Sequence, residues 1–203
     1  MSFSVKVPGS GEGEKEFELA PEGTHPAVCY RVYDVGTQAV KGKFALDEEG
    51  KQKYKRTVYL AFELSNELMA DGRPFAVSRD FTLSLDPKAK LRAFLESWLG
   101  AKFEDGATFD LDGVLGKPAL LSVVHSKPNE AGRQYANVGG VLPLPKGMPK
   151  PKNVNPLHYF TFNDYRQEDF DAMPEGLRKK AMESKEYKAR GTKSDNFDED
   201  LPF

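Results

Sequence analysis

A single amphipathic segment stands among stretches that alternate like β-strands, and its place in the order of elements limits the folds open to this chain. Its apolar residues recur at helical spacing and so share one face. They are Leu91, Phe94, Leu95, Trp98 and Leu99. Asp86 and Pro87 precede this stripe as an N-cap and a first-turn residue, and Gly100 follows it as a left-handed C-cap. The sequence therefore predicts a helix over residues 87–99.

Stretches rich in β-branched and aromatic residues flank this helix, three before it and two after it. In the clearest of them, Val58, Leu60, Phe62 and Leu64 share one face of a strand. The predicted strands are 26–35, 56–64, 74–83, 117–125 and 134–142. Three strands, a helix and two strands follow the plan of the OB-fold. We therefore expect a mostly β protein, a five-stranded OB-fold barrel with a helix between strands 3 and 4. Another small barrel of similar strand count is the structural alternative.

Changes in composition divide the chain into five regions. They are a flexible N-terminal lead-in (1–19), the OB-fold domain (20–145), a Pro/Lys linker (146–156), a partly helical C-terminal extension (157–190) and a disordered acidic tail (191–203). The extension includes a short predicted helix over 174–187, but it has too few apolar positions for a core of its own. It folds back on the barrel, pairs with a second subunit, or becomes ordered on a partner.

Composition and missing motifs argue against several classes of protein. Cys29 is the only cysteine, so an internal disulfide is impossible and a reducing cytoplasm is the expected setting. No apolar run approaches the roughly 20 residues of a membrane span, so we expect no membrane partner. His25, His125 and His158 are far apart and lack partners at ligand spacing, so we expect no metal and no cofactor. The chain also lacks a P-loop and a nucleophile elbow, so we expect no enzyme.

The distribution of charged and aromatic residues points to nucleic acid. Residues 41–56 are rich in lysine and arginine, whereas four carboxylate side chains gather in the last nine residues. Binding of an unpaired strand needs cations along the backbone and flat rings on which bases stack. The predicted loops between strands 1 and 2 and between strands 4 and 5 contain both, and in OB-folds these loops border the ligand face.

Strand residues on the outward face complete the predicted surface. If Val28, Tyr30 and Val32 point inward, then Arg31 and Tyr33 face the groove. By the same alternation Tyr59 faces outward on the second strand. The predicted DNA-binding residues are Arg31, Tyr33, Lys41, Lys43, Phe44, Lys53, Tyr54, Lys55, Arg56, Tyr59, Lys127, Arg133 and Tyr135.

The last residues of the chain indicate a second binding activity. Their carboxylates favour water over a protein core, while the terminal ring can enter an apolar pocket on another protein whose lysines or arginines meet the acidic run. The predicted partner-binding residues are Asp198, Glu199, Asp200, Leu201, Pro202 and Phe203. A tail that only aids solubility is the alternative.

This acidic end with its Pro-Phe terminus resembles the tip of bacterial and phage single-stranded DNA-binding proteins. Three stretches of the body, 20–28, 81–88 and 115–123, are similar to phage replication and recombination proteins of this type. The resemblance implies a phage-encoded protein in the host cytoplasm that protects single-stranded DNA. It also implies recruitment of replication, recombination and repair proteins through the tip, and a monomer or homodimer.

Two other functions remain open from the residues alone. The barrel face could bind another protein without any nucleic acid, which would make the chain a protein-interaction module. A nuclease or another phosphoryl-transfer enzyme is the third possibility, and metal-dependent cleavage of DNA would establish it.

Overall fold

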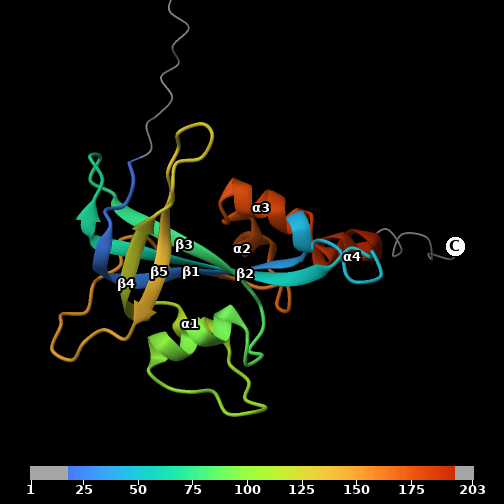
Figure 1. The fold of residues 1–203 in the computed structure, drawn as a ribbon, viewed down its shortest axis with the longest axis horizontal. Coiled ribbons are helices and arrows are strands. Elements are labelled where there is room, and N and C mark those ends of the chain that lie inside the picture. The colour runs from blue at the N-terminus through green and yellow to red at the C-terminus, as the bar shows by residue number, and fades with distance from the viewer. Residues whose placement is uncertain (1–17, 195–203) are drawn as a thin grey trace, which may run out of the picture.

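The computed structural model describes residues 18–194, which form a mostly β structure with helices on two sides of a sheet (Figure 1). The strands are β1 (Gly23–Ala39), β2 (Tyr54–Leu68), β3 (Pro74–Thr82), β4 (Pro118–His125), β5 (Ala136–Leu142) and β6 (His158–Phe160). The helices are α1 (Lys90–Leu99), α2 (Gln167–Asp171), α3 (Glu175–Met182) and α4 (Lys185–Ser194). Two short 3-10 helices, Gly42–Phe44 and Leu111–Val114, lie in the connections.

Five strands pair antiparallel in the order β3-β2-β1-β4-β5. The long strand β1 pairs with two strands along one edge. Its residues 23–28 pair with β4, and its residues 31–33 pair in parallel with β6. Within the described residues the ladder ends at β3 and β5, so the sheet is not closed into a barrel. The expected mostly β class, five antiparallel strands and helix after the third strand are present.

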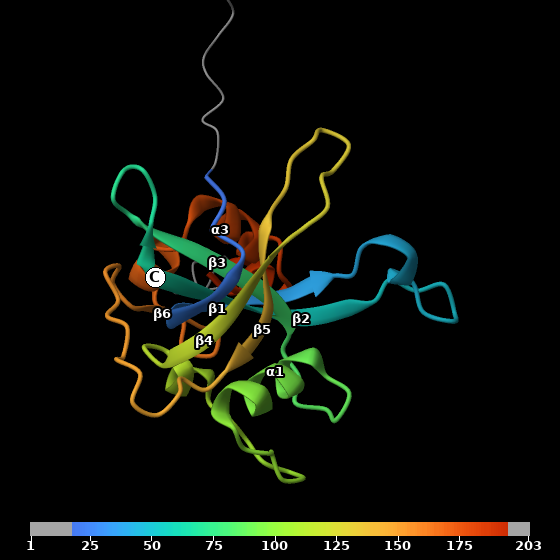
Figure 2. The same ribbon diagram turned by 60° about the vertical axis from the view of Figure 1, so that its left-hand side comes forward.

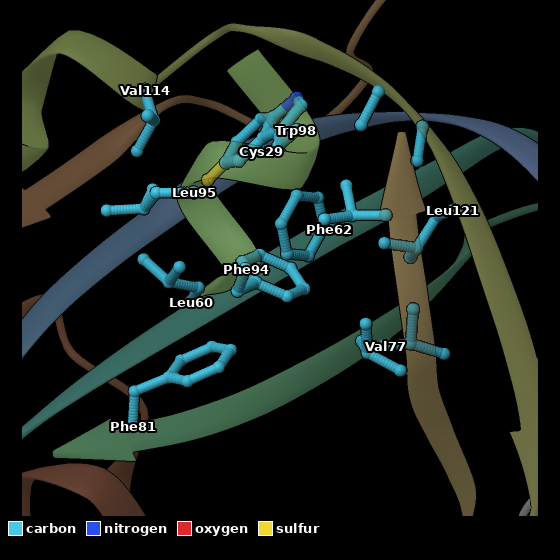
Figure 3. Packing of buried hydrophobic residues seen from close by; sticks show 14 of the residues in the cluster. Cys29, Leu60, Phe62, Val77, Phe81, Phe94, Leu95, Trp98, Val114 and Leu121 are labelled. Carbon is cyan, nitrogen blue, oxygen red and sulfur yellow. The ribbon is translucent and has the colours of Figure 1, made fainter. Parts of the chain in front are cut away.

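The main core lies between the curved sheet and α1. Figure 3 shows Phe94, Leu95 and Trp98 of this helix beside Leu60 and Phe62 of β2. All five side chains are buried, and the ring centroids of Phe62 and Trp98 lie 5.2 Å apart. The predicted apolar faces of the helix and of β2 are therefore confirmed.

The helix α1 begins later than the sequence predicts. Asp86 is not its N-cap: the carboxylate of Asp86 accepts a hydrogen bond from the backbone N–H of Lys88, which forms a turn before the helix. Ala89 takes the N-cap position without a side-chain hydrogen bond. The predicted end is confirmed, because Gly100 adopts the left-handed conformation with φ 67°.

A bulge changes which residues of β1 face the core. The ladder with β2 shifts register between Cys29 and Arg31, so Cys29 and Val32 both point into the main core. Of the expected core set Val28, Tyr30 and Val32, only Val32 lies in the main core, because Ala27 and Cys29 face the core before the bulge and the bulge then brings Val32 to the same side. A second shift between Asp34 and Gly36 bends the strand further.

The C-terminal extension folds back on the sheet. Its helices α2, α3 and α4 gather on the side away from α1 (Figure 1). There they form a second apolar cluster with β1, in which Phe160, Phe170, Met173 and Ala181 pack against Tyr33. The folded-back arrangement is thus the one observed among the three that the sequence left open.

Two other features of the C-terminal region were not predicted from the sequence. The helix α4 continues through Ser194, into the region 191–203 that the sequence assigns to the acidic tail, and the rest of that region lies outside the described residues. The linker 146–156 is attached near its end to a buried carboxylate of β2. Glu63 accepts hydrogen bonds from the backbone N–H groups of Val154 and Asn155, at 2.6 and 2.9 Å. This carboxylate fixes where the extension begins.

Candidate nucleic-acid interface

Two loops extend from the sheet in different directions (Figure 2). The first arm, residues 40–55, consists of the connection from β1 to β2 and the first two residues of β2, and the second arm, residues 126–135, joins β4 to β5. These arms contain nine of the thirteen residues predicted to bind DNA. They are Lys41, Lys43, Phe44, Lys53, Tyr54, Lys55, Lys127, Arg133 and Tyr135, and all nine are exposed.

Hydrogen bonds from the side chain of Gln52 to backbone carbonyl groups hold the first arm together. The side-chain amide of Gln52 donates hydrogen bonds to the carbonyl groups of Val40, Ala45 and Lys53, at 2.8 to 3.1 Å. This bracing leaves the Phe44 ring 66% exposed. An aromatic ring that no core covers, among several lysines, is suited to stacking on a base.

Cations lie on the aromatic rings of the first arm. The ammonium of Lys43 lies 4.9 Å from the centre of the Phe44 ring, and that of Lys185 lies 3.6 Å from the centre of the Tyr54 ring. Because Lys185 opens α4, the C-terminal extension brings positive charge to the base of this arm. Lys185 was not among the predicted binding residues, since only the fold brings it to Tyr54.

The second arm carries the third exposed ring. The side-chain oxygen of Asn129 accepts hydrogen bonds from the backbone N–H groups of Ala131 and Arg133, which forms the turn. At the base of the arm, the N–H of Ser126 donates to the carbonyl of Tyr135 at 2.9 Å, which extends the ladder of β4 and β5. The side chain of Tyr135 is therefore fixed at its backbone and exposed at its ring.

The outward-facing tyrosines of the strands are not open to a ligand. Tyr33 is fully buried under the C-terminal extension, and its ring stacks on that of Tyr59 with centroids 6.0 Å apart. Its hydroxyl lies 2.7 Å from Nδ1 of His158, and burial raises the pKa of Tyr33. The expectation that Tyr33 faces an open groove is wrong, and Tyr59 is likewise packed against this second cluster.

His158 lies at this covered face, between Tyr33 and Asp169. Burial lowers the pKa of its imidazole, Asp169 raises it in part, and Arg31 lowers it further. The Nε2 atom of His158 lies 3.7 Å from the carboxylate of Asp169. The imidazole also lies edge-on to the Tyr33 ring, with centroids 5.1 Å apart.

The two predicted arginines of the strands also have structural partners. Arg56 forms an ion pair with Asp34, whose side chain is only 7% exposed, and it donates a second hydrogen bond to Asn163 at 2.8 Å. The pair with Asp34 raises the pKa of Arg56. Arg31 lies over the ring of Tyr30 at 4.7 Å. Arg56 is therefore a bridge between the sheet and the extension rather than a free surface cation.

A cavity of about 410 Å³ lies at the opening between β3 and β5. Its lining residues are Ser78, Arg79, Asp80, Asn137 and Val138. One guanidinium nitrogen of Arg79 donates to the carbonyl of Val138 at 3.0 Å, so a side chain spans the place where strands would otherwise pair. This cavity was not predicted from the sequence. Three consecutive polar residues, 78–80, interrupt the predicted strand 74–83, and this pattern could have indicated a polar site there.

Other kinds of site are not formed in the part of the chain that the structure describes. Within residues 18–194, the structure contains no cluster of three or more His, Cys, Asp or Glu side chains suited to a metal ion. Over the same range no helix has the length and apolar character needed to cross a membrane. The predicted partner-binding residues 198–203 lie outside the described residues.

Comparison with known proteins does not assign the chain to a family. No protein-family model matches it, and no curated protein matches it significantly.

Proposed function

We propose that this protein binds single-stranded DNA between its two arms, with little dependence on sequence. The observation that carries the proposal is the pair of projecting arms with their exposed rings Phe44, Tyr54 and Tyr135 among lysines and Arg133. Rings stack on unpaired bases of any identity, and cations follow the phosphates. Each stacked base contributes about 1–3 kcal/mol to binding.

We further propose that the sheet is a variant of the OB-fold. The strand order β3-β2-β1-β4-β5, with α1 between β3 and β4, supports this assignment. An OB-fold is a partly open five-stranded barrel whose ligand face is bordered by the loops after the first and fourth strands. Those loops correspond to the two arms.

The DNA would contact the arms and not the outer face of β1. The extension covers Tyr33 and Tyr59, so a strand that crosses between the arms meets the exposed side of the extension instead. Lys185 and Lys188 of α4 are exposed, and Lys185 already lies on Tyr54. These two cations would add to the electrostatic attraction for phosphates.

The acidic tip would recruit replication, recombination and repair proteins to the coated strand. This part of the proposal rests on the sequence of residues 198–203 and their resemblance to the tip of single-stranded DNA-binding proteins. A chain that ends at residue 194 should bind oligo-dT as well as the full chain does, or more tightly at low salt. It should fail to capture those proteins.

A titration of fluorescently labelled oligo-dT at two salt concentrations tests the central proposal. Anisotropy should rise on binding, and affinity should fall with salt. The slope of the logarithm of affinity against the logarithm of salt concentration should become shallower by about 0.7 for each phosphate contact that a variant loses. Lys53→Ala should reduce the slope, whereas Lys90→Ala, the same loss of charge on α1, should not. Absence of binding at low salt would contradict the proposal and favour a protein-interaction module.

A further inference from the structure

The cavity between β3 and β5 has the chemistry of a site for one nucleobase. On the basis of the proposed function, we infer that it accepts a base of the bound strand and prefers bases that carry an exocyclic amino group. Cytosine and adenine have this group in reach of their Watson–Crick edge, whereas thymine and uracil present a keto oxygen at the same position.

The lining contains one carboxylate, and the two cations beside it already have partners. Asp80 contributes a carboxylate that is 43% exposed, and Lys180 of α3 pairs with it at 2.5 Å. The guanidinium of Arg79, also in the lining, already donates to Val138 and lies over the Phe81 ring at 5.2 Å. Because these cations are engaged, a ligand would meet the Asp80 carboxylate, which repels a phosphate and does not repel a neutral base.

The hydrogen-bonding groups match an amino-bearing edge. Asn137 donates through its amide nitrogen to the carbonyl of Tyr135 at 3.0 Å, which directs its amide oxygen to act as an acceptor. The carboxylate of Asp80 supplies the second acceptor. Carboxylates accept from the amino group of cytosine, and asparagine pairs with adenine. A keto oxygen facing these same acceptors would lose the hydrogen bonds it makes in water.

The size and position of the cavity fit one base of a strand held at the second arm. About 410 Å³ is near the lower limit of pockets that hold small organic ligands, which run from roughly 300 to 1,000 Å³. Asn137 follows Tyr135 by two residues in an extended ladder, so both side chains lie on the same side of the strand. A base stacked on Tyr135 would thus bring its neighbour to the opening.

Oligo-dC and oligo-dU of equal length test this inference, because their bases differ only at the ring edge that the cavity would read. We expect the full chain to bind oligo-dC about threefold to tenfold more tightly, the range for one or two hydrogen bonds. The comparison uses anisotropy at neutral pH and one salt concentration.

Asp80→Ala and Lys180→Ala form a matched pair of variants. Both break the exposed ion pair between β3 and α3, but only Asp80→Ala removes an acceptor from the cavity. Asp80→Ala should bring the ratio of the dC and dU affinities close to one. Lys180→Ala should keep the preference for dC, even if both affinities fall with the removal of a cation. Asn137 is an exposed residue of β5 that also lines the cavity, so Asn137→Ala should likewise reduce the ratio of the dC and dU affinities.

The outcomes separate this inference from the proposed function. Binding of both oligomers with equal affinity by the full chain would overturn the base site and leave single-stranded DNA binding intact. A preference for dC that persists in both Asp80→Ala and Asn137→Ala would overturn it as well, because the preference would then arise elsewhere. Failure to bind either oligomer would overturn both proposals.

Discussion

A Cβ atom on Gly36 would lie only 2.5 Å from the Cβ atom of Ser184, so β1 passes directly beneath the C-terminal extension at this point. Gly36 also adopts φ +76°, a conformation that residues with a side chain rarely take. Next to it, the backbone N–H and hydroxyl of Thr37 both donate to the carboxylate of Glu186, at 2.6 Å each. The covering of the sheet by α3 and α4 therefore depends on a glycine at position 36.

Gly36→Ala should destabilise the protein by roughly 2–5 kcal/mol, because it combines a strained backbone with a collision against Ser184. Gly42→Ala is the matched control: its φ is +75°, but no atom lies near the added methyl group. That change should cost only about 1–2 kcal/mol. Urea unfolding measures both values. Equal losses of stability in the two variants would show that the extension does not press on β1.

Arg56→Ala should lower stability by about 3 kcal/mol, because it leaves the buried carboxylate of Asp34 without its cation. The destabilisation should appear in urea unfolding without any DNA present. Lys55→Ala removes an exposed charge one residue away and should change stability by less than about 0.5 kcal/mol. If both variants are as stable as the unmodified chain, the ion pair between Arg56 and Asp34 carries no structural role.

Tyr135→Ala should weaken binding of oligo-dT by about 1–3 kcal/mol, since one stacking ring is removed from the second arm. Tyr135→Phe keeps the ring and should bind nearly as well as the unmodified chain. Tyr33→Phe should also leave binding unchanged, because the Tyr33 hydroxyl is buried against His158. Anisotropy titrations of the three variants compare these effects. A strong decrease in affinity on Tyr33→Phe would mean that DNA displaces the extension.

Glu96→Gln should make the protein less stable at neutral pH, and the difference should shrink in acid. The N–H of Phe103 and the cations of Lys102 and Arg92 lower the pKa of the Glu96 carboxyl from 4.5 to about 2. A depressed pKa means that the folded state binds the proton less readily than the unfolded state. The stabilisation is thus fully present above pH 4.5 and is lost as the pH falls towards 2.

Thermal melting of the Glu96→Gln variant and the unmodified chain at several pH values checks this dependence. The gap between their melting temperatures should be widest near neutral pH and should narrow between pH 4.5 and 2. A gap that stays constant over that range would show that the interactions of Glu96 with residues 92–103 do not depend on its charge.

Local patterns in the sequence determined the elements that rest on nearby residues. The alternation of Val58, Leu60, Phe62 and Leu64 predicted one face of β2, and that face lies in the main core. The apolar stripe before Gly100 predicted α1 and its end. The loops rich in lysine and aromatic residues were predicted as exposed, and the structure leaves them exposed. These properties follow from periodicity and local backbone preference, which a single sequence contains.

The tertiary structure alone decided which of the predicted surfaces is open. Tyr33 satisfies the pattern of an outward strand face, and Arg56 belongs to the same basic segment, 41–56, as the exposed cations of the first arm. Their partners, His158 and Asn163, are more than 100 residues later in the chain. Burial of this kind depends on how distant segments pack, and a bulge between Cys29 and Arg31 further changes which residues of β1 face the core. The opening between β3 and β5 likewise arises only when the two edge strands come together without pairing.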